Sequence, residues 1–334
     1  MPRRATLVAA CAATAAALGA SAALLSARGS DDHIAPREGL AERTLATLIA
    51  VPGGSFMAGN YDVPFLDADG TVQTRPAYSP ANALAAHAVD LPGFLLQDRE
   101  VSQAEFDLYL DALGLPVAAP DHTSFANLPD RPAAMLWQEA RDYCAWLGQQ
   151  VGLPMRLPAE AEWEYAARSG GLVVPWATDD GSYRAGQNVP AARYGEPESQ
   201  NPPVASFPAN PMGFHDMARG LYEWVGDHTP SDAGDLRVFK GGSNFSDALY
   251  ETIPMRGRAE PLADSETLRS IIPADLLARM EHVWPAPVHA GSGVIGARCA
   301  ADLPDPLPAG IRRAAIPAAM PGPFEAVDLP PLPR

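Results

Sequence analysis

The segment of residues 210–224, NPMGFHDMARGLYEW, constrains the fold of this chain more than any other stretch. Its Asn-Pro pair and Gly213 are turn residues, which interrupt a regular helix or strand. The segment also offers closely spaced oxygen atoms, from the carboxylates of Asp216 and Glu223 and from the backbone carbonyls of residues 219–221. Calcium takes six to eight oxygen ligands, many of them carbonyls in tight loops. The segment therefore predicts a calcium loop or, taken alone, an ordinary loop with two solvated acids.

Composition favours short elements joined by many loops. The 334 residues include 28 glycines and 35 prolines, together about 19% of the chain against about 12% in average usage. This length suits one large domain or two smaller ones. The formal net charge of −16 argues against nucleic acid or an anionic membrane surface as a partner, because both are bound through basic patches. An acidic surface favours solubility and also suits cations.

The first 27 residues are typical of an export signal. Two arginines precede an uncharged, alanine-rich run over residues 5–27, and Ala-Ser-Ala at 20–22 is a suitable cleavage site. A twin-arginine signal, an uncleaved anchor and a lipoprotein box at Cys11 are the alternatives. We expect a cleaved signal and a periplasmic or secreted product, attached to a membrane only if the segment stays uncleaved.

Strand and loop patterns divide the chain after a polar, charged linker at residues 28–43. Residues 45–51 form a β-like run that ends at a Pro-Gly-Gly turn, and residues 88–96 predict a further strand pair. Residues 170–210 contain Gly, Pro, Asp and Asn throughout, so we expect them to be almost entirely loop.

Two helices have recognisable ends. Ser102 and Glu105 have the spacing of a capping box, which predicts a helix that begins there and ends near Leu113. A second helix is expected over residues 137–151, and Gly152 marks its end.

A third helix is predicted within RLPAEAEWEYAAR, residues 156–168. Pro158 suits the first helical position, and acidic residues are favoured near a helix start by the dipole. The three glutamates at 160, 162 and 164 are therefore interpreted as part of the helix start rather than as acid/base catalysts. Glu164 and Arg168 are four residues apart and are expected to pair.

Six blocks of sequence together resemble the sulfatase-modifying-factor, or formylglycine-generating-enzyme, family. Residues 210–224 are similar to its signature N-x-F-G-L-Y-D-M-x-G-N-V-W-E-W. The other blocks, in the order of the family, are VPGGSFMAGN (51–60), EVSQAEFDLYL (100–110), RLPAEAEWEYAAR (156–168), VFKGGSNF (238–245) and IGARCA (295–300). The resemblance implies an α+β, loop-rich, C-type-lectin-like domain over residues 44–302. The Pro-rich tail, residues 303–334, is expected to be extended or disordered.

The resemblance also implies two structural calcium ions. The side chain of Asn188 and the carbonyl of Val189 match ligands of the first, and a third ligand would fall near Glu196. The second would be bound by the residues Asp216, Arg219, Leu221 and Glu223. Arg219 stands where the family has Gly, and Gly220 where it has Asn, but any residue can donate a backbone carbonyl.

The positions of the family's catalytic copper ligands have changed. In formylglycine-generating enzymes two cysteines five residues apart follow the GGS turn and bind copper(I), which soft thiolates select. The matching positions here are Ser246 and Glu251. We therefore expect no formylglycine formation by the copper mechanism. The candidate pocket comprises Tyr222, Ser243, Asn244, Ser246, Tyr250 and Glu251, and any catalytic metal is unknown.

Other catalytic centres have weaker support in the sequence. The seven histidines include no HxH or HExxH pattern. A non-haem iron centre would need two histidines and a carboxylate to converge, for which His215, His228, Asp227 and Glu251 are the candidates. Ser246 as a hydrolytic nucleophile lacks a nucleophile-elbow motif.

Cys144 and Cys299 are the two cysteines that remain once Cys11 leaves with the signal. An even number in an exported chain is typical of disulfides. Both positions resemble family positions that are joined, and such a bridge would be worth roughly 4–5 kcal/mol in the chain-entropy model. A reactive thiol pair is the alternative.

Residues 261–290 predict a helical insertion, divided in two by Pro273, that could form an apolar lid. Two functions remain open. The first is an oxidoreductase-like maturation factor for a periplasmic peptide or small molecule, since family branches in pyoverdine maturation and ergothioneine synthesis also lack the cysteine pair. The second is a non-catalytic ligand-binding or accessory module on the same fold.

Overall fold

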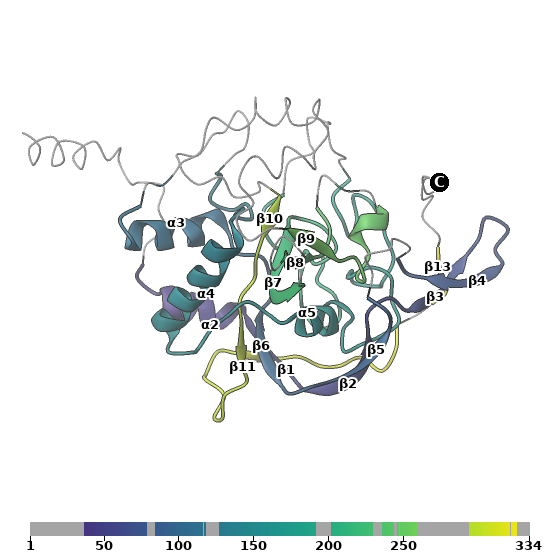
Figure 1. Ribbon diagram of the computed structural model, residues 1–334, viewed down its shortest axis with the longest axis horizontal. Coiled ribbons are helices and arrows are strands. Elements are labelled where there is room, and N and C mark those ends of the chain that lie inside the picture. Colours follow the sequence, from purple (N-terminus) through teal and green to yellow (C-terminus); the bar gives the residue numbers. More distant parts are fainter. Residues whose placement is uncertain are drawn as a thin grey trace, which may run out of the picture.

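The computed structural model describes residues 37–78, 84–115, 117, 127–191, 202–229, 236–243, 246, 248–259, 294–320 and 322–325; for 249, 250 and 325 only the backbone is described. The signal, most of the linker, Glu196, Asn244, the insertion at 261–290 and the last nine residues therefore lie outside it. Within the described ranges no helix is long and apolar enough to cross a membrane. Short helices and strands alternate with long loops (Figure 1), so the predicted α+β, loop-rich class is confirmed.

The helices are α2 (Leu40–Thr47), α3 (Gln103–Ala112), α4 (Trp137–Val151), α5 (Glu160–Ala167) and the 3-10 helix η1 (Ala248–Glu251). Helices α3, α4 and α5 lie close to the three predicted positions, whereas α2 and η1 were not predicted. The capping box of Ser102 and Glu105 precedes α3, and Gly152 ends α4 in the left-handed conformation, with φ 71°.

Two local predictions are wrong. Residues 40–47 form helix α2 where the end of a linker and the start of a strand were expected, and the buried Leu40, Thr44 and Thr47 attach it to the domain. Pro158 lies before the N-cap Ala159 of α5 and not at its first helical position.

Four small sheets carry the strands. Their orders are β11-β6-β1-β12, β10-β7-β8-β9, β13-β3-β4 and β2-β5. The strands are β1 (Leu48–Val51), β2 (Gly54–Ala58), β3 (Asp62–Leu66), β4 (Val72–Pro76), β5 (His87–Leu91), β6 (Phe94–Gln97), β7 (Tyr222–Thr229), β8 (Leu236–Lys240), β9 (Gly257–Ala259), β10 (Ile295–Gly296), β11 (Ala300–Asp302), β12 (Arg312–Arg313) and β13 (Phe324–Glu325). The predicted strand pair at 88–96 is present as β5 and β6, which belong to different sheets.

The C-terminal segment is part of the domain as far as residue 325. Strand β12 pairs with β1, and β13 pairs with β3. Phe324 is 4% exposed and belongs to the main core. The prediction of a separate, disordered tail is therefore wrong for residues 303–325, because these two pairings and one aromatic side chain fix a proline-rich chain onto the sheets.

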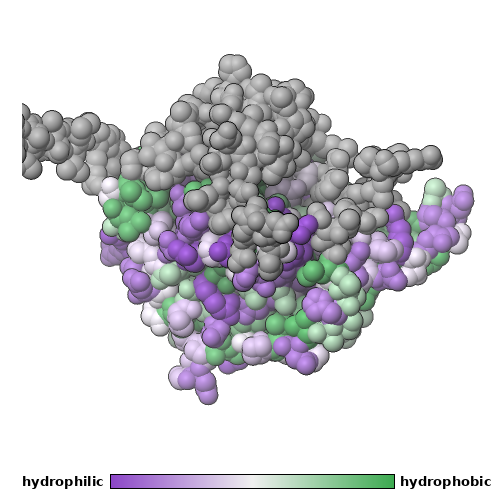
Figure 2. All heavy atoms as spheres, viewed as in Figure 1, coloured by the Kyte–Doolittle hydropathy of each residue, from purple (hydrophilic) through white to green (hydrophobic). Residues whose placement is uncertain are grey.

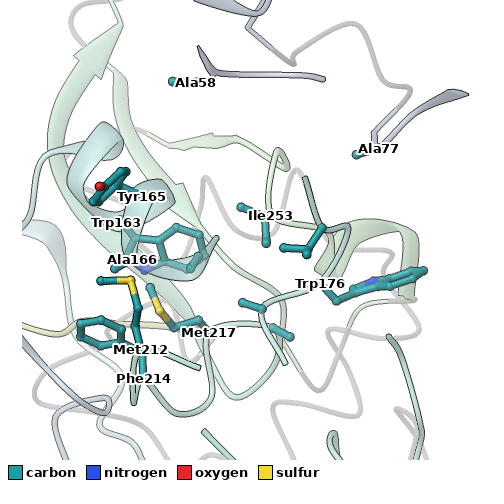
Figure 3. Close-up of a cluster of buried hydrophobic side chains, with 14 of the residues drawn as sticks. Ala58, Ala77, Trp163, Tyr165, Ala166, Trp176, Met212, Phe214, Met217 and Ile253 are labelled. Atoms are coloured by element: carbon teal, nitrogen blue, oxygen red, sulfur yellow. The ribbon is translucent and has the colours of Figure 1, made fainter. Parts of the chain in front are cut away.

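The core forms around helix α5, whose Trp163 and Tyr165 are almost fully buried (Figure 3). Met212, Phe214 and Met217 come from the loop after residue 210 and pack in the same cluster. The hairpin of β3 and β4 projects from the body of the molecule (Figure 1), and its visible surface is largely hydrophilic (Figure 2).

Asn210 explains why the segment 210–224 starts as a loop. Its amide nitrogen donates to the carbonyl of Ala166 at 2.8 Å, at the end of α5. Its amide oxygen accepts the backbone N–H groups of Met212 and Phe214, each at 3.1 Å. The side chain thus closes a turn and attaches it to the helix, as the turn residues predicted.

Cys144 and Cys299 form the predicted disulfide. Their sulfurs are 2.03 Å apart and their Cα atoms 5.5 Å apart. The bridge joins helix α4 to the chain just before β11, 155 residues later. Both cysteines are fully buried, so the structural interpretation holds and the reactive thiol pair does not.

Candidate functional site

The two positions that match the copper cysteines lie side by side. Ser246 Oγ lies 3.4 Å from Glu251 Oε1, donates to the carbonyl of Ser243 at 2.7 Å and accepts the Ser243 N–H at 2.9 Å. The turn after GGS thus brings the two side chains together as the resemblance implies. A hydroxyl and a carboxylate are hard oxygen ligands, however, and they do not replace thiolates for copper(I). The donor set does not fit the family's copper ion.

Glu251 has a charged partner that the sequence did not reveal. Arg219 Nε lies 3.6 Å from Glu251 Oε1, and the side chains are 2% and 0% exposed. The guanidinium also donates from Nη1 to the carbonyl of Pro190 at 2.8 Å and to the hydroxyl of Tyr183 at 3.1 Å. Arg219 was expected to donate only a carbonyl. The missed signal is that two departures from the family pattern, at 219 and 251, carry opposite charges.

The rest of the predicted pocket is partly described. Ser243 is fully buried in the GGS turn. Tyr222 is half-buried, and its ring packs on that of Phe239 with centroids 5.0 Å apart. Asn244 and the side chain of Tyr250 lie outside the described residues.

The predicted ligands of the first calcium form a tight turn of their own. Asn188 Oδ1 accepts the backbone N–H of Arg184 at 2.8 Å, and the Val189 carbonyl accepts that of Gly186 at 2.7 Å. The amide nitrogen of Asn188 donates to Asp179 Oδ1 at 2.9 Å. Both predicted donor oxygens are therefore already hydrogen-bonded within the loop of residues 179–190.

The predicted second loop surrounds a buried guanidinium. Arg298 donates to both carboxylate oxygens of Glu223, at 2.6 and 2.7 Å, and Trp163 Nε1 donates to one of them at 2.9 Å. Glu100 Oε1 accepts the N–H of Leu221 at 2.8 Å. Asp216 has a φ of 62°, a left-handed conformation that aspartate tolerates in turns.

Negative charge exceeds positive charge around this second loop. Burial, followed by the charges of Glu223 and Asp216, raises the pKa of Glu100 well above its usual value. Burial also raises the pKa of Asp216 to about 6. Three carboxylates thus face one buried guanidinium, Arg298, and a divalent cation would offset their repulsion. Both carboxylate oxygens of Glu223 already accept hydrogen bonds from Arg298, and Asp216 accepts the N–H of Ala205, so a calcium ion in this loop would have to share these oxygens with their donors.

No wider metal cluster is present in the described part of the chain. There, no three His, Cys, Asp or Glu side chains lie in an arrangement that could hold a metal ion. His215 bonds the carbonyl of Phe207 at 2.8 Å, Asp227 accepts the N–H of Glu160, and Glu251 pairs with Arg219. The iron centre considered from His215, His228, Asp227 and Glu251 is therefore not formed. Any calcium in the second loop has to use backbone carbonyls as well as side chains.

The glutamates of α5 do more than start the helix. Glu160 accepts Arg256 Nε at 2.9 Å, and the buried Lys240 Nζ lies 3.6 Å from both Glu160 and Glu164. Glu164 also pairs with Arg168 at 3.2 Å, as predicted. The sequence did not indicate that these glutamates pair with cations from β8 and from the chain before β9.

A small hollow of about 10 Å³, roughly the space of one water molecule, lies between the two predicted calcium loops. Asn188, Val189 and Pro190 line it from one side, and Asp216, Ala218 and Arg219 from the other. Asn188 and Val189 of the first predicted ligand set and Asp216 and Arg219 of the second therefore lie around the same hollow. The side chain of Arg219 spans the gap from the second loop to the first.

Comparison with known proteins supports a common origin for this architecture. A family model described as the sulfatase-modifying factor enzyme 1-like domain matches residues 36–268. The chain is 27% identical over 273 residues to the formylglycine-generating enzyme of Mus musculus, covering 62% of this chain and 68% of that protein. It is 34% identical over 119 residues to the inactive C-alpha-formylglycine-generating enzyme 2 of Bos taurus, covering 32% of this chain. The chain spans 28% and 36% of the length of two of the curated relatives it matches.

The solved structure of PvdO from Pseudomonas aeruginosa has a similar fold. The TM-score is 0.54 at 22% identity, covering 77% of this chain and 94% of that one. At this identity the similarity concerns the fold alone, and function has to be argued from the site.

Proposed function

The chain belongs to the sulfatase-modifying factor enzyme 1-like family, and we propose that it is a copper-free member that serves as an exported ligand-binding or accessory module. The observation that carries the proposal is the buried Glu251, which stands at one of the two thiol positions and pairs with Arg219. A carboxylate held by a guanidinium is not the soft thiolate ligand that copper(I) selects, so Glu251 cannot replace the cysteine at its position. The pairing also makes removal of either partner costly, since the other would remain as a buried charge.

Calcium belongs to the proposal through the second loop only. Asp216 and Glu223 would supply carboxylate oxygens, and the backbone of Arg219 and Leu221 would supply carbonyls. Bound there, calcium would provide positive charge for a buried cluster of carboxylates. The role would be structural, because Met217 of this loop packs in the main core.

Export is proposed from the N-terminal sequence and is supported by the disulfide. Bridges such as Cys144–Cys299 persist in oxidising compartments and are rare in reducing ones. The mass of the purified mature protein tests this point. Loss of about the first 22 residues is expected, and an intact N-terminus recovered from the cell interior would contradict export.

Copper binding and cysteine oxidation test the proposal as a whole. The mature protein is loaded anaerobically with copper(I), challenged with a copper(I) chelator, and then incubated in air with a cysteine-containing peptide that is followed by mass spectrometry. We expect no retained copper and no aldehyde product, whereas disulfide formation by the peptide in air is not diagnostic. Stoichiometric copper or an aldehyde product would overturn the proposal. The triple variant Ser246→Cys/Glu251→Cys/Arg219→Gly is the positive control, and it should gain copper(I) affinity.

An oxidoreductase-like maturation factor is the second candidate. Its support is the family relationship together with Tyr222 and Ser243, which the resemblance places on either side of the reactive centre. Such an activity would need an oxidant other than the thiolate-bound copper of the family. Turnover of a periplasmic peptide or small molecule that survives Glu251→Gln would favour this second candidate over the binding module.

A further inference from the structure

The loop of residues 179–190 gathers oxygen atoms around one nitrogen. The amide nitrogen of Asn188 lies 2.9 Å from Asp179 Oδ1, 3.3 Å from Asp180 Oδ1 and 3.1 Å from the carbonyl of Ser182. Such a set of oxygens is what a divalent cation prefers. Here a hydrogen-bond donor occupies the position that the cation would take.

The orientation of the Asn188 amide follows from its other neighbour. The backbone N–H of Arg184 can only donate, and it points at the Asn188 side chain over 2.8 Å. The atom that faces it must therefore be the amide oxygen, which leaves the NH₂ group toward the two aspartates. If the amide turned to offer its oxygen to a metal, its NH₂ group would face the N–H of Arg184, and two donors would oppose each other. The oxygens of Asp179, Asp180 and Ser182 would also lose their hydrogen bonds from Asn188.

Two guanidinium groups supply positive charge to the same loop. Arg184 pairs with Asp180 and lies 3.2 Å from Asp179, with both carboxylates about one-third exposed. Arg219, from the other side of the hollow, donates to the carbonyl of Pro190 and to the hydroxyl of Tyr183. Those two contacts lie near opposite ends of the 184–189 turn. Arg219 thus attaches the loop to the protein interior, as a bridging ion would.

We infer that Arg184 and Arg219 act as built-in cations that hold the 179–190 loop, and that this loop takes no divalent ion. The arrangement contrasts with the 216–223 loop, where carboxylates outnumber cations. The inference concerns a different loop from the calcium proposal above and does not depend on it. On this inference the side chain of Arg219 has two roles: it holds the 179–190 loop, and it pairs with Glu251.

Hydrogen exchange measured by mass spectrometry tests the inference on the full mature protein. Peptides covering 179–190 and 216–223 are compared in calcium chloride and in EGTA. We expect exchange in 179–190, including the N–H groups of Gly186 and Asn188, to be the same in both. In Arg219→Gln it should be about tenfold faster with or without calcium, because the loop then opens locally. Arg184→Gln, at a half-exposed side chain that is dispensable for the core, is the second variant and should show a smaller increase.

The outcomes separate this inference from the calcium proposal. Calcium-dependent exchange confined to 216–223 supports both, and calcium-independent exchange everywhere supports the inference while contradicting the calcium proposal. If calcium slows both loops, calorimetric titration with calcium decides between one ion and two. One ion per chain, lost in Glu223→Gln and kept in Asn188→Ala, supports the inference. Two ions, or loss of binding in Asn188→Ala, overturns it.

Discussion

The loops at 179–190 and 216–223 lie on either side of one small hollow, yet their charges are balanced differently. In the first, aspartates are paired with Arg184, and an amide NH₂ occupies the centre of the oxygen set. In the second, Glu100, Asp216 and Glu223 surround the single guanidinium of Arg298. The family resemblance implied a calcium ion in each loop, but the two loops differ in their balance of carboxylates and cations. In the first, charge is balanced by groups of the chain itself, and in the second an excess of carboxylates remains.

Replacing Arg298 should have the largest effect, because it leaves the second loop with no internal cation. Arg298→Met is expected to lower the free energy of unfolding by about 3–5 kcal/mol, the usual cost of an uncompensated buried charge. Denaturant unfolding in EGTA measures the change, and added calcium should recover part of it. Glu223→Gln is the matched control for loss of the partner. A loss below about 1 kcal/mol would show that the carboxylates are balanced in another way.

Arg219→Gln tests the connection between the two loops and should cost about 3 kcal/mol, since Glu251 is fully buried. In the double variant Arg219→Gln/Glu251→Gln the penalty should fall, giving a coupling energy of at least about 1 kcal/mol in a double-mutant cycle. Unfolding curves of the four proteins supply the cycle. Additive losses would mean that Arg219 acts through Pro190 and Tyr183 alone.

Calcium itself should stabilise the wild-type protein through the second loop. At a concentration one hundred times the dissociation constant, the expected gain is about 2.7 kcal/mol. The gain should disappear in Glu223→Gln and persist in Asn188→Ala, as followed by thermal unfolding in calcium and in EGTA. Loss of the gain in the Asn188 variant would reverse the assignment of the two loops.

Asp179→Asn should have the smallest effect. Asp179 is about one-third exposed and its pair with Arg184 is partly solvated, so a loss under about 1 kcal/mol is expected. The response to calcium should be unchanged. A larger loss that calcium restores would indicate a metal site in the first loop.

Local chemistry in the sequence predicted the parts of the fold that depend on neighbouring residues. The capping box of Ser102 and Glu105 and the turn closed by Asn210 act over a few residues, and both are present. The Cys144–Cys299 bridge was predicted through the family resemblance rather than through local pattern. The capping box and the turn depend on a fixed spacing between neighbouring residues, and each of the two remaining cysteines has only the other as a possible partner.

The ion pairs of the site could not be predicted in the same way. Arg298 reaches Glu223 across 75 positions of sequence, and nothing near either residue indicates the other. The same holds for Arg256 with Glu160, 96 positions away. Buried charges select partners through the packing of whole elements, so a charged residue in an apolar stretch shows that a partner exists without naming it.

The pairing of β12 with β1 has a practical consequence for anyone who wishes to produce a shorter version of this protein. The match to the family model ends at residue 268, but Arg298, Cys299 and the strands from β10 to β13 all follow it. A recombinant chain trimmed to the matched region would lose half of the disulfide and would leave the backbone of β1 and β6 open on their outer sides. Exposed strand edges invite association between copies, so the trimmed protein should aggregate, whereas one that ends after residue 325 should remain soluble.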